Sequence, residues 1–481
     1  MILRPTFHFT SRRIKCSPLP TRVWTATRIA LGVSVAICLT TWNSIHGDSE
    51  KEDTTTDSES PPASGPPPLA GLRFTDPTDQ SLWRQRIRFF GPRDRKELKD
   101  GIINVYSLAR FDAHIRSASN GIQSLISVLD GDLVNHVNIA DTVQENLWFH
   151  VQALFRWYQL DHSDPHPVEH IDKPHPPAGA IRAVIEAAIT YTDEFFLNHS
   201  LGRVFSSQSK TNAVDGIRAT SASCLVSALY EADVRLLHVA SLGNMRGILG
   251  RRRETEDGKV VYDVHVLTVD HTPENPAEKS RIEGLHAGED VIENGELFGR
   301  PYTRALGDGK LKWSPEVQSR LHKDYLGAPP DPKIKTPPYI SAQPDVNTIE
   351  ILPNDFLVLS SRWLTECLTD EEVVGLVGAW LEKNRDGLYG EDEPEKPLPQ
   401  TPEVILPEDL PVDLKQDKSV MYRRWNVPKR FINVDRTPVM HLATNAMGGA
   451  DTGLREALTP LPPPQSEGNS KSLGIAVILF E

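Results

Sequence analysis

The stretch FLVLSSRWLTECL, residues 356–368, constrains the fold of this chain more than any other segment. The apolar run FLVLSS shows no alternation of apolar and polar residues, which predicts a strand buried on both faces. A short turn follows, and Thr369 and Glu372 form a capping-box pair at the start of a helix predicted over residues 369–383. Because a strand covered on both faces needs a layer on each side, the chain must form stacked layers.

Similar patterns recur along the chain. Further strands are predicted over residues 234–240, 246–249, 260–269, 347–352 and 474–480. Helices are predicted over residues 120–133, 143–158 and 179–198, the last with an apolar face of Ile181, Val184, Ile185, Ala188 and Ile189. Together these segments predict a mixed, layered α+β domain.

The composition excludes several classes of protein. The chain has 481 residues and a formal net charge of −13, which argues against a nucleic-acid-binding protein because phosphate backbones require basic patches. Its four cysteines are widely spaced and form no Cys-x-x-Cys pair: Cys16, Cys38, Cys224 and Cys367. We therefore expect neither a disulfide framework nor a zinc site.

The first 47 residues contain six Arg and Lys residues and no Asp or Glu, as is typical of a mitochondrial presequence. Residues 29–42 form an uncharged run of 14 residues, short of the roughly 20 that a membrane span requires. A longer run over residues 23–42 includes Arg28, whose side chain could reach the membrane surface. A single-pass anchor in the inner mitochondrial membrane, a cleaved presequence and a secretory signal all stay open, although the absence of paired cysteines speaks against secretion.

Two segments have the composition of linkers. Residues 48–70 are acidic and rich in Ser, Thr and Pro, and predict a disordered linker. The folded domain is therefore expected over residues 71–481. Within it, a proline-rich insertion at about residues 386–415 is predicted to be a surface excursion, because helix and strand patterns resume after it.

Four motifs in order resemble the type 2C serine/threonine protein phosphatases, and among these most closely the mitochondrial pyruvate dehydrogenase phosphatases of fungi. They span residues 219–252 (ATSASC to ILGRR), 267–272 (LTVDHT), 299–313 (GRPYTRALGDGKLKW) and 335–346 (KTPPYISAQPDV). Each motif alone is a weak signal, whereas the ordered set is specific. The resemblance implies an α-β-β-α sandwich, in which two mainly antiparallel sheets are stacked and flanked by helices.

The resemblance also implies a centre of two divalent metals, Mg or Mn, with a bridging water as the nucleophile. Hard cations of this kind take carboxylate and carbonyl oxygens as ligands. In RFDAH, residues 110–114, Asp112 matches the bridging carboxylate and Ala113 could supply a backbone carbonyl. His114 matches the residue that is expected to protonate the leaving group in an active enzyme.

Three other positions of this metal centre have lost their acids. By resemblance, Asn244 replaces the Asp of G-D-S-R, which helps to bind an additional metal. Arg362 replaces the metal-binding Asp of S-D-G, and Leu473 replaces the last metal carboxylate. Since a guanidinium repels a divalent cation, the pattern implies a pseudophosphatase. Two other matched residues, Arg304 and Asp308, are predicted to be structural and to brace a turn.

These losses leave several functions open. We expect first a catalytically inactive phosphatase-like protein without a metal cofactor, which binds a phosphoprotein or an active phosphatase paralogue. The alternatives are an active Mg- or Mn-dependent phosphatase with a recruited ligand such as Glu366, and a membrane-tethered structural module. In the inactive case, Arg362 is predicted either to pair with Asp112 or to point into solvent.

Overall fold

The computed structural model describes residues 87–90, 102–110, 113–119, 123–131, 143, 146–151, 154, 178–207, 209–325, 327–388, 404–415, 419–458 and 473–480. All of them belong to one of the two compact units of the chain, the unit formed by residues 76–154 and 166–481. The predicted presequence, the segment over residues 23–42 and the linker over residues 48–70 lie outside this described part and stay predictions.

One antiparallel sheet, here called sheet A, contains the strand predicted from the apolar run FLVLSS. Its strands, in spatial order, are β1 (Ile87–Phe90), β2 (Ile102–Arg110), β16 (Leu473–Phe480), β13 (Phe356–Ser360), β7 (Arg246–Glu254) and β8 (Val260–Val266). The central position of β13, between β16 and β7, agrees with its continuous apolar sequence.

A second antiparallel sheet, sheet B, is built from residues between 113 and 350. Its strands, in spatial order, are β12 (Asp345–Glu350), β6 (Leu236–Leu242), β5 (Ala222–Glu231), β4 (Gln123–Gly131) and β3 (Ala113–Ser119), and the short β11 (Leu306–Gly307) pairs with β5. Two short antiparallel pairs lie outside both sheets: β9 (Ile292–Glu293) with β10 (Glu296–Leu297), and β14 (Val404–Ile405) with β15 (Phe431–Ile432).

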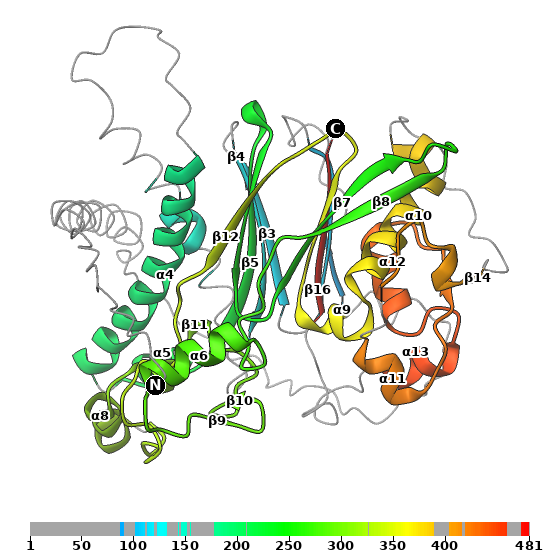
Figure 1. Cartoon of the computed structure of the whole chain (residues 1–481). Coiled ribbons are helices and arrows are strands. Elements are labelled where there is room, and N and C mark those ends of the chain that lie inside the picture. The colour runs from blue at the N-terminus through cyan, green and yellow to red at the C-terminus, as the bar shows by residue number, and fades with distance from the viewer. Residues whose placement is uncertain are drawn as a thin grey trace, which may run out of the picture. The chain divides into compact units, whose positions relative to one another are not determined.

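Helices cover the outer faces of both sheets (Figure 1). On sheet B, α4 (Ala178–Ser206) contacts β6, β11 and β12, and α5 (Lys210–Arg218) packs on α4. On sheet A, α10 (Asp370–Leu388) contacts β7 and β8, and α12 (Pro438–Ala446) contacts β2 and β16. This α-β-β-α arrangement confirms the predicted fold class. The shorter helices are α6 (Pro276–Leu285), α7 (Gly309–Lys312), α8 (Pro315–Tyr325), α9 (Arg362–Cys367), α11 (Val420–Trp425) and α13 (Thr452–Leu458).

Two apolar cores hold these layers together, and β13 contributes to both. Phe356 and Val358 belong to the cluster that joins sheet A to α10 and α12, whereas Leu357 and Leu359 belong to the cluster between the two sheets. The alternation follows from the two-residue period of a strand, which points successive side chains to opposite faces. The prediction of a strand buried on both faces is therefore confirmed.

The helix predicted over residues 120–133 is wrong, because this segment is strand β4. Leu125 and Leu129 have the spacing of a helix face, but Ile126 and Val128 pack into the core between the sheets. Short apolar runs fit both periods, and pairing with β3 and β5 decides in favour of the strand. The helix predicted at residue 369 is confirmed, since α10 begins at Asp370.

The end of the predicted proline-rich insertion packs into the domain. Leu410 is 5% exposed and belongs to the core cluster beneath α10. Gly375 permits this packing, because a Cβ atom there would lie 2.9 Å from the Cβ of Leu410. Residues 404–415 are thus partly core, and the interpretation as a surface excursion stays a prediction for residues 389–403, which lie outside the described ranges.

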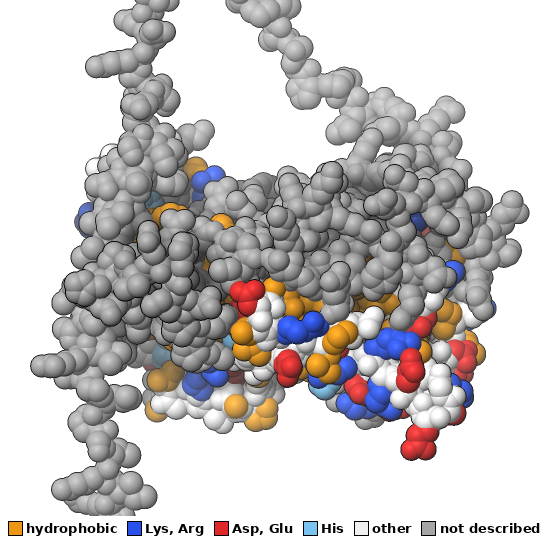
Figure 2. All heavy atoms as spheres, turned by 90° about the horizontal axis from the view of Figure 1, so that it is seen from above, with side chains coloured by type: hydrophobic (Ala, Val, Ile, Leu, Met, Phe, Trp, Pro, Cys, Tyr) orange, Lys and Arg blue, Asp and Glu red, His pale blue; other side chains and the backbone are white. Residues whose placement is uncertain are grey.

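The surface is mixed in character. On the face shown in Figure 2, basic, acidic and hydrophobic side chains alternate where the atoms are coloured. Cys224 and Cys367 are buried free thiols. Among the residues that the structure describes, no helix has both the length and the apolar character needed to cross a membrane.

Candidate functional site

The strand order of sheet A brings the predicted metal-site positions to one edge of the sheet. Leu473 at the start of β16 pairs with Arg110 at the end of β2, two residues before Asp112. At the same edge β13 ends at Ser360, which is paired with Ile475 of β16 and with Arg246 of β7. The adjacent strands β2, β16, β13 and β7 thus have these ends at the same side of the sheet. Position 473 begins β16, position 112 comes two residues after the end of β2, position 362 two residues after the end of β13, and position 244 two residues before the start of β7. In Figure 1, α9 lies at this end of β16.

Ser361 fixes the end of β13 against β16. Its backbone N–H donates to the carbonyl oxygen of Gly474 at 2.9 Å, and its hydroxyl oxygen accepts from the N–H of Gly474 at 3.1 Å. These two hydrogen bonds extend the pairing of β13 with β16 by one residue, to Ser361. The next residue of β16 towards the edge, Leu473, is 3% exposed and belongs to the core cluster. A buried leucine offers no oxygen to a metal.

Arg362 opens α9 and forms an ion pair within that helix. Its Nε lies 3.1 Å from Oε1 of Glu366, and the side chains of Arg362 and Glu366 are 37% and 12% exposed. The spacing of four residues puts both side chains on one helix face. Asp112, the partner predicted for Arg362, lies outside the described residues, so that pairing stays a prediction. Glu366, the predicted alternative metal ligand, has its carboxylate paired with the guanidinium of Arg362.

A tight turn positions Asn244 between β6 and β7. Gly243 has a φ of +89° and a Cβ atom there would lie 2.3 Å from Sγ of Cys224, so only glycine fits. The Gly243 N–H donates to Nδ1 of His271 at 3.1 Å, which places the ring proton on Nε2, 2.8 Å from Oδ2 of Asp345. Burial lowers the pKa of His271, and the hydrogen bond to Asp345 partly opposes this. The neutral ring therefore holds the turn that carries Asn244.

Arg246 makes contacts that the sequence does not indicate, and they join three segments beside this edge. The Nη2 of Arg246 donates to Oδ2 of Asp270 at 2.9 Å, and its Nε lies 3.5 Å from Oδ1 of Asp370. Burial raises the pKa of Asp370, whereas the charge of Arg246 opposes that shift. Asp270 and Asp370 are 24 and 124 residues from Arg246, so no local spacing could have revealed the group.

Arg304 is held by a buried carboxylate. Its Nη2 and Nε lie 2.5 and 3.1 Å from the two carboxylate oxygens of Glu278, which also accepts from the Thr303 hydroxyl at 2.5 Å. Burial alone would raise the pKa of Glu278, but the hydrogen bonds from Arg281, Arg304 and Thr303 outweigh it and lower the pKa. These contacts tie the segment before β11 to α6, as a structural role for Arg304 requires.

Asp308 makes a comparable brace. Its side chain is fully buried, and its Oδ2 accepts from Nε of Arg300 at 2.8 Å. The residue has a φ of +52°, and its N–H donates to the carbonyl oxygen of Ser221 at 2.8 Å. It thus joins the turn before α7 to the start of β5. The structural role of Asp308 stays a prediction that this geometry supports.

The described side chains at the edge do not fit a centre of two divalent cations. Arg362 adds a positive charge, Leu473 adds hydrocarbon, and Asn244 provides no charge, where hard cations need carboxylates. Ala113 and His114 begin β3, but their side chains and the whole of Asp112 lie outside what the structure describes. In the described part, no group of three or more His, Cys, Asp or Glu residues could hold a metal ion.

Comparison with known proteins gives a family for this arrangement. A family model described as "Protein phosphatase 2C" matches residues 184–396, from α4 to just beyond α10. A protein phosphatase 2C homolog of Schizosaccharomyces pombe is 31% identical over 311 residues, which are 64% of each chain. The mitochondrial pyruvate dehydrogenase phosphatase 1 of Saccharomyces cerevisiae is 29% identical over 334 residues, which are 66% of this chain and 54% of the yeast protein.

The chain thus spans less than two thirds of the length of either fungal relative. Among solved structures, the serine-threonine phosphatase 2C from Toxoplasma gondii aligns with 82% of this chain and 99% of its own, with a TM-score of 0.45 and 14% identity. The predicted resemblance is confirmed by the family match and by the fungal relatives. Residues 184–396 thus carry a protein phosphatase 2C domain, and the chain is similar to type 2C protein phosphatases of fungi.

Proposed function

We propose that this protein is a catalytically inactive member of the family, which binds phosphoprotein partners without hydrolysing them. The observation that carries the proposal is the Arg362–Glu366 ion pair at the edge of sheet A, next to the buried Leu473. A guanidinium stands where the family resemblance expects a carboxylate. Glu366, the nearest acid on the same helix, is engaged by that guanidinium.

Electrostatics favour this reading over an active centre. Two divalent cations bring a charge of +4, and the acids of a family site offset it. Here two of the four aligned positions are neutral and one is cationic, which leaves Asp112 as the only aligned acid. A cation close to Arg362 would be repelled by its guanidinium, and water at this partly exposed side chain weakens the repulsion without reversing its sign.

The alternative is an active phosphatase that uses Mg or Mn through acids outside the aligned set. The retained Asp112 and His114 are the sequence features in its favour. In that case Glu366 would have to leave Arg362 for the metal. Under this alternative the substrate would be pyruvate dehydrogenase, which the names of the yeast and human relatives contain.

A mitochondrial location is part of the proposal. The supporting observations are the basic, acid-free first 47 residues and the word "mitochondrial" in the names of the yeast and human relatives. A phosphoprotein of mitochondria, or an active paralogue acting on one, is the partner that this location suggests. The inner-membrane anchor over residues 23–42 stays a proposal beside the cleaved presequence.

The test measures hydrolysis and binding with one phosphoserine peptide. We expect no phosphate release by the full-length chain with Mn, and binding of the phosphorylated peptide that exceeds binding of its unphosphorylated form. Turnover that Asp112→Ala abolishes would refute the inactive reading. Equal binding of the two peptide forms would instead refute the partner-binding part.

A matched variant tests whether the three lost acids explain the inactivity. Asn244→Asp, Arg362→Asp and Leu473→Asp together restore the aligned charges, and we expect them to create Mn affinity by calorimetry. Since Leu473 is buried, circular dichroism must first show that the variant folds; Asn244→Asp with Arg362→Asp is the version that leaves the core unchanged. Unaltered Mn affinity in both folded variants would contradict the assignment of this edge.

A further inference from the structure

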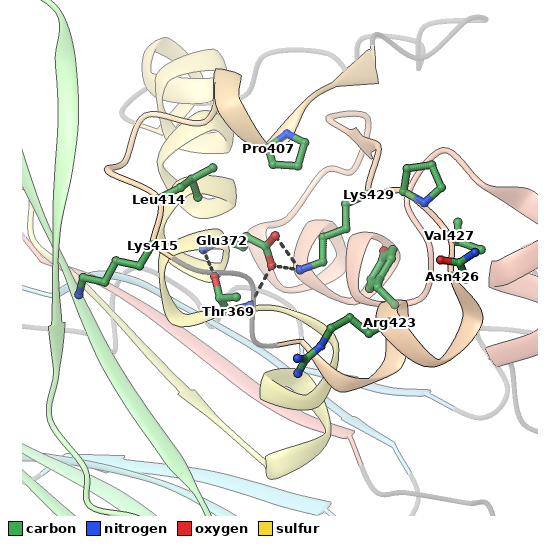
Figure 3. Close-up of a pocket in the computed structure, with 11 residues that line it drawn as sticks. Thr369, Glu372, Pro407, Leu414, Lys415, Arg423, Asn426, Val427 and Lys429 are labelled. Atoms are coloured by element: carbon green, nitrogen blue, oxygen red, sulfur yellow. Dashed lines mark hydrogen bonds and ion pairs between the residues drawn. The ribbon is translucent and has the colours of Figure 1, made fainter.

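A pocket of about 450 Å³ lies between the start of α10, the residues around η2 (Pro407–Asp409) and α11, away from the strand ends described above. Its volume is within the range of roughly 300–1,000 Å³ that is usual for ligand pockets. Glu372, Lys415, Arg423 and Lys429 line it together with Leu414 and Val427 (Figure 3). Three of these four charged residues are cationic.

A buried ion pair forms the floor of the pocket. Nζ of Lys429 lies 2.7 and 2.6 Å from the two carboxylate oxygens of Glu372, and both side chains are 5% exposed. Tyr422 anchors α11 beside them, since it is 2% exposed and its hydroxyl donates to the carbonyl oxygen of Asn445. Side chains on such a scaffold lose little further conformational freedom when a partner binds.

The rim carries the basic charge. In Figure 3, the Lys415 and Arg423 side chains extend away from the buried Glu372–Lys429 pair. Lys415 has its Nζ 3.2 Å from Oε1 of Glu371 but is 78% exposed. Residues 415–430 contain six Lys and Arg against one Asp, a net charge of +5 in a chain whose net charge is −13. This contrast makes the segment attractive to an acidic partner.

Exposed apolar residues are frequent in the same part of the sequence. Of the ten large hydrophobic residues that are exposed in the described part of the chain, four lie in residues 404–425: Val404, Leu406, Leu414 and Trp425. Trp425, the last residue of α11, is 48% exposed. Trp and Arg are the residue types that most often dominate binding energy at protein interfaces, and exposed apolar patches mark such sites.

We propose that this pocket docks an acidic segment of a partner protein that carries an apolar side chain among its acids. The acids face Lys415 and Arg423, and the apolar side chain packs against Leu414 and Val427 of the lining. Because α11 packs on α9, which begins with Arg362, the docked segment lies one helix away from the candidate centre. The proposal is independent of whether that centre hydrolyses phosphate.

Fluorescence anisotropy of the full-length chain tests the proposal with a labelled synthetic peptide, in which glutamates flank a Leu-Phe pair. We expect binding that weakens as salt rises, and a loss of about tenfold in affinity for Leu414→Ala and for Arg423→Ala. Replacing the glutamates by glutamines, or the Leu-Phe pair by serines, should each abolish most of the binding. Absence of binding by the wild-type chain would overturn the proposal.

Two matched variants separate the pocket from the general surface. Lys259→Ala removes an exposed ammonium at the turn between β7 and β8, and Leu285→Ala removes an exposed apolar side chain of α6. Both should bind the peptide as the wild type does, and equal losses in these variants would overturn the proposal. Should Arg423→Ala lower the unfolding midpoint, Lys415→Ala is the replacement that cannot disturb the core.

A competing occupant lies within the chain itself. Residues 48–59 contain six Asp and Glu residues, and the test must therefore distinguish them from a partner's acidic segment. Converting these acids to amides leaves peptide affinity unchanged under our proposal. A rise in affinity would show that the chain's own acidic segment fills the pocket, and would overturn the assignment to a partner.

Discussion

Removal of the Lys429 ammonium is expected to lower the free energy of unfolding by about 3 kcal/mol. Nζ of Lys429 lies within 2.7 Å of both carboxylate oxygens of Glu372, and each side chain is 5% exposed. Loss of one partner of a buried pair typically costs about 3–5 kcal/mol, because the other charge stays buried. Glu372 keeps the hydrogen bond from the N–H of Thr369 at 2.8 Å, which favours the lower end of that range.

Urea denaturation of Lys429→Met measures this effect, and an exposed pair provides the control. Lys333 and Glu293 have the same Nζ–O distance of 2.7 Å, but both side chains are 58% exposed. Lys333→Met should leave the unfolding midpoint unchanged, since exposed ion pairs contribute little. Equal shifts for Lys429→Met and Lys333→Met would refute the reasoning, because the distance would then matter and burial would not.

A double variant tests where the cost arises. Lys429→Met combined with Glu372→Gln removes both charges of this buried pair. The new amide oxygen can still accept from the N–H of Thr369. We therefore expect the double variant to recover about 2 kcal/mol relative to Lys429→Met alone. Additive losses in the two single variants would mean that the pair is not coupled.

Four further outcomes follow from individual contacts. Arg362→Ala should cost less than about 1 kcal/mol, because its pair with Glu366 is partly exposed; a larger fall in the unfolding midpoint would indicate a second partner. Gly243→Ala should cost about 2–4 kcal/mol by urea denaturation, since the new Cβ meets Cys224 at a positive φ; a neutral result would contradict the turn geometry. Burial raises the pKa of Asp435 to about 6, so the folded state holds this proton more tightly than the unfolded chain and stability falls as pH rises from about 4 to about 6. Asp435→Asn should therefore raise the unfolding free energy by about 1–3 kcal/mol at pH 8 and change it little at pH 4. Excess Mn or a chelator should leave the unfolding midpoint unchanged, whereas a metal at 100 times its Kd would add about 2.7 kcal/mol.

Local chemistry made parts of this fold predictable. Thr369 and Glu372 predict the start of α10. Both capping hydrogen bonds are present: the Thr369 N–H donates to Glu372, and the Glu372 N–H donates to the Thr369 hydroxyl. The β13 sequence likewise predicts a strand covered on both faces. Each signal is contained within a few residues, so it needs no knowledge of the tertiary structure.

Long-range partners were not predictable in this way. β4 was mistaken for a helix because its apolar residues fit both periods until the neighbouring strands are known. Lys429 and Glu372 are 57 residues apart in the sequence, and nothing in either segment indicates the other. The pair of Arg362 with Glu366 is different, since a spacing of four residues on a helix is a readable signal.

The candidate centre shows how the domain can keep its fold while its aligned acids disappear. Acids gathered at one sheet edge repel each other unless a cation neutralises them, so acids at positions 244, 362 and 473 would destabilise the metal-free domain. The residues present avoid that repulsion. Leu473 adds to the core, and Arg362 meets Glu366 within α9. Strand pairing at the edge depends instead on Ser361 and Gly474, whose two hydrogen bonds need no metal. The hydrogen bonds at this edge therefore need no bound metal, and the α-β-β-α sandwich is compatible with the inactive protein that we propose.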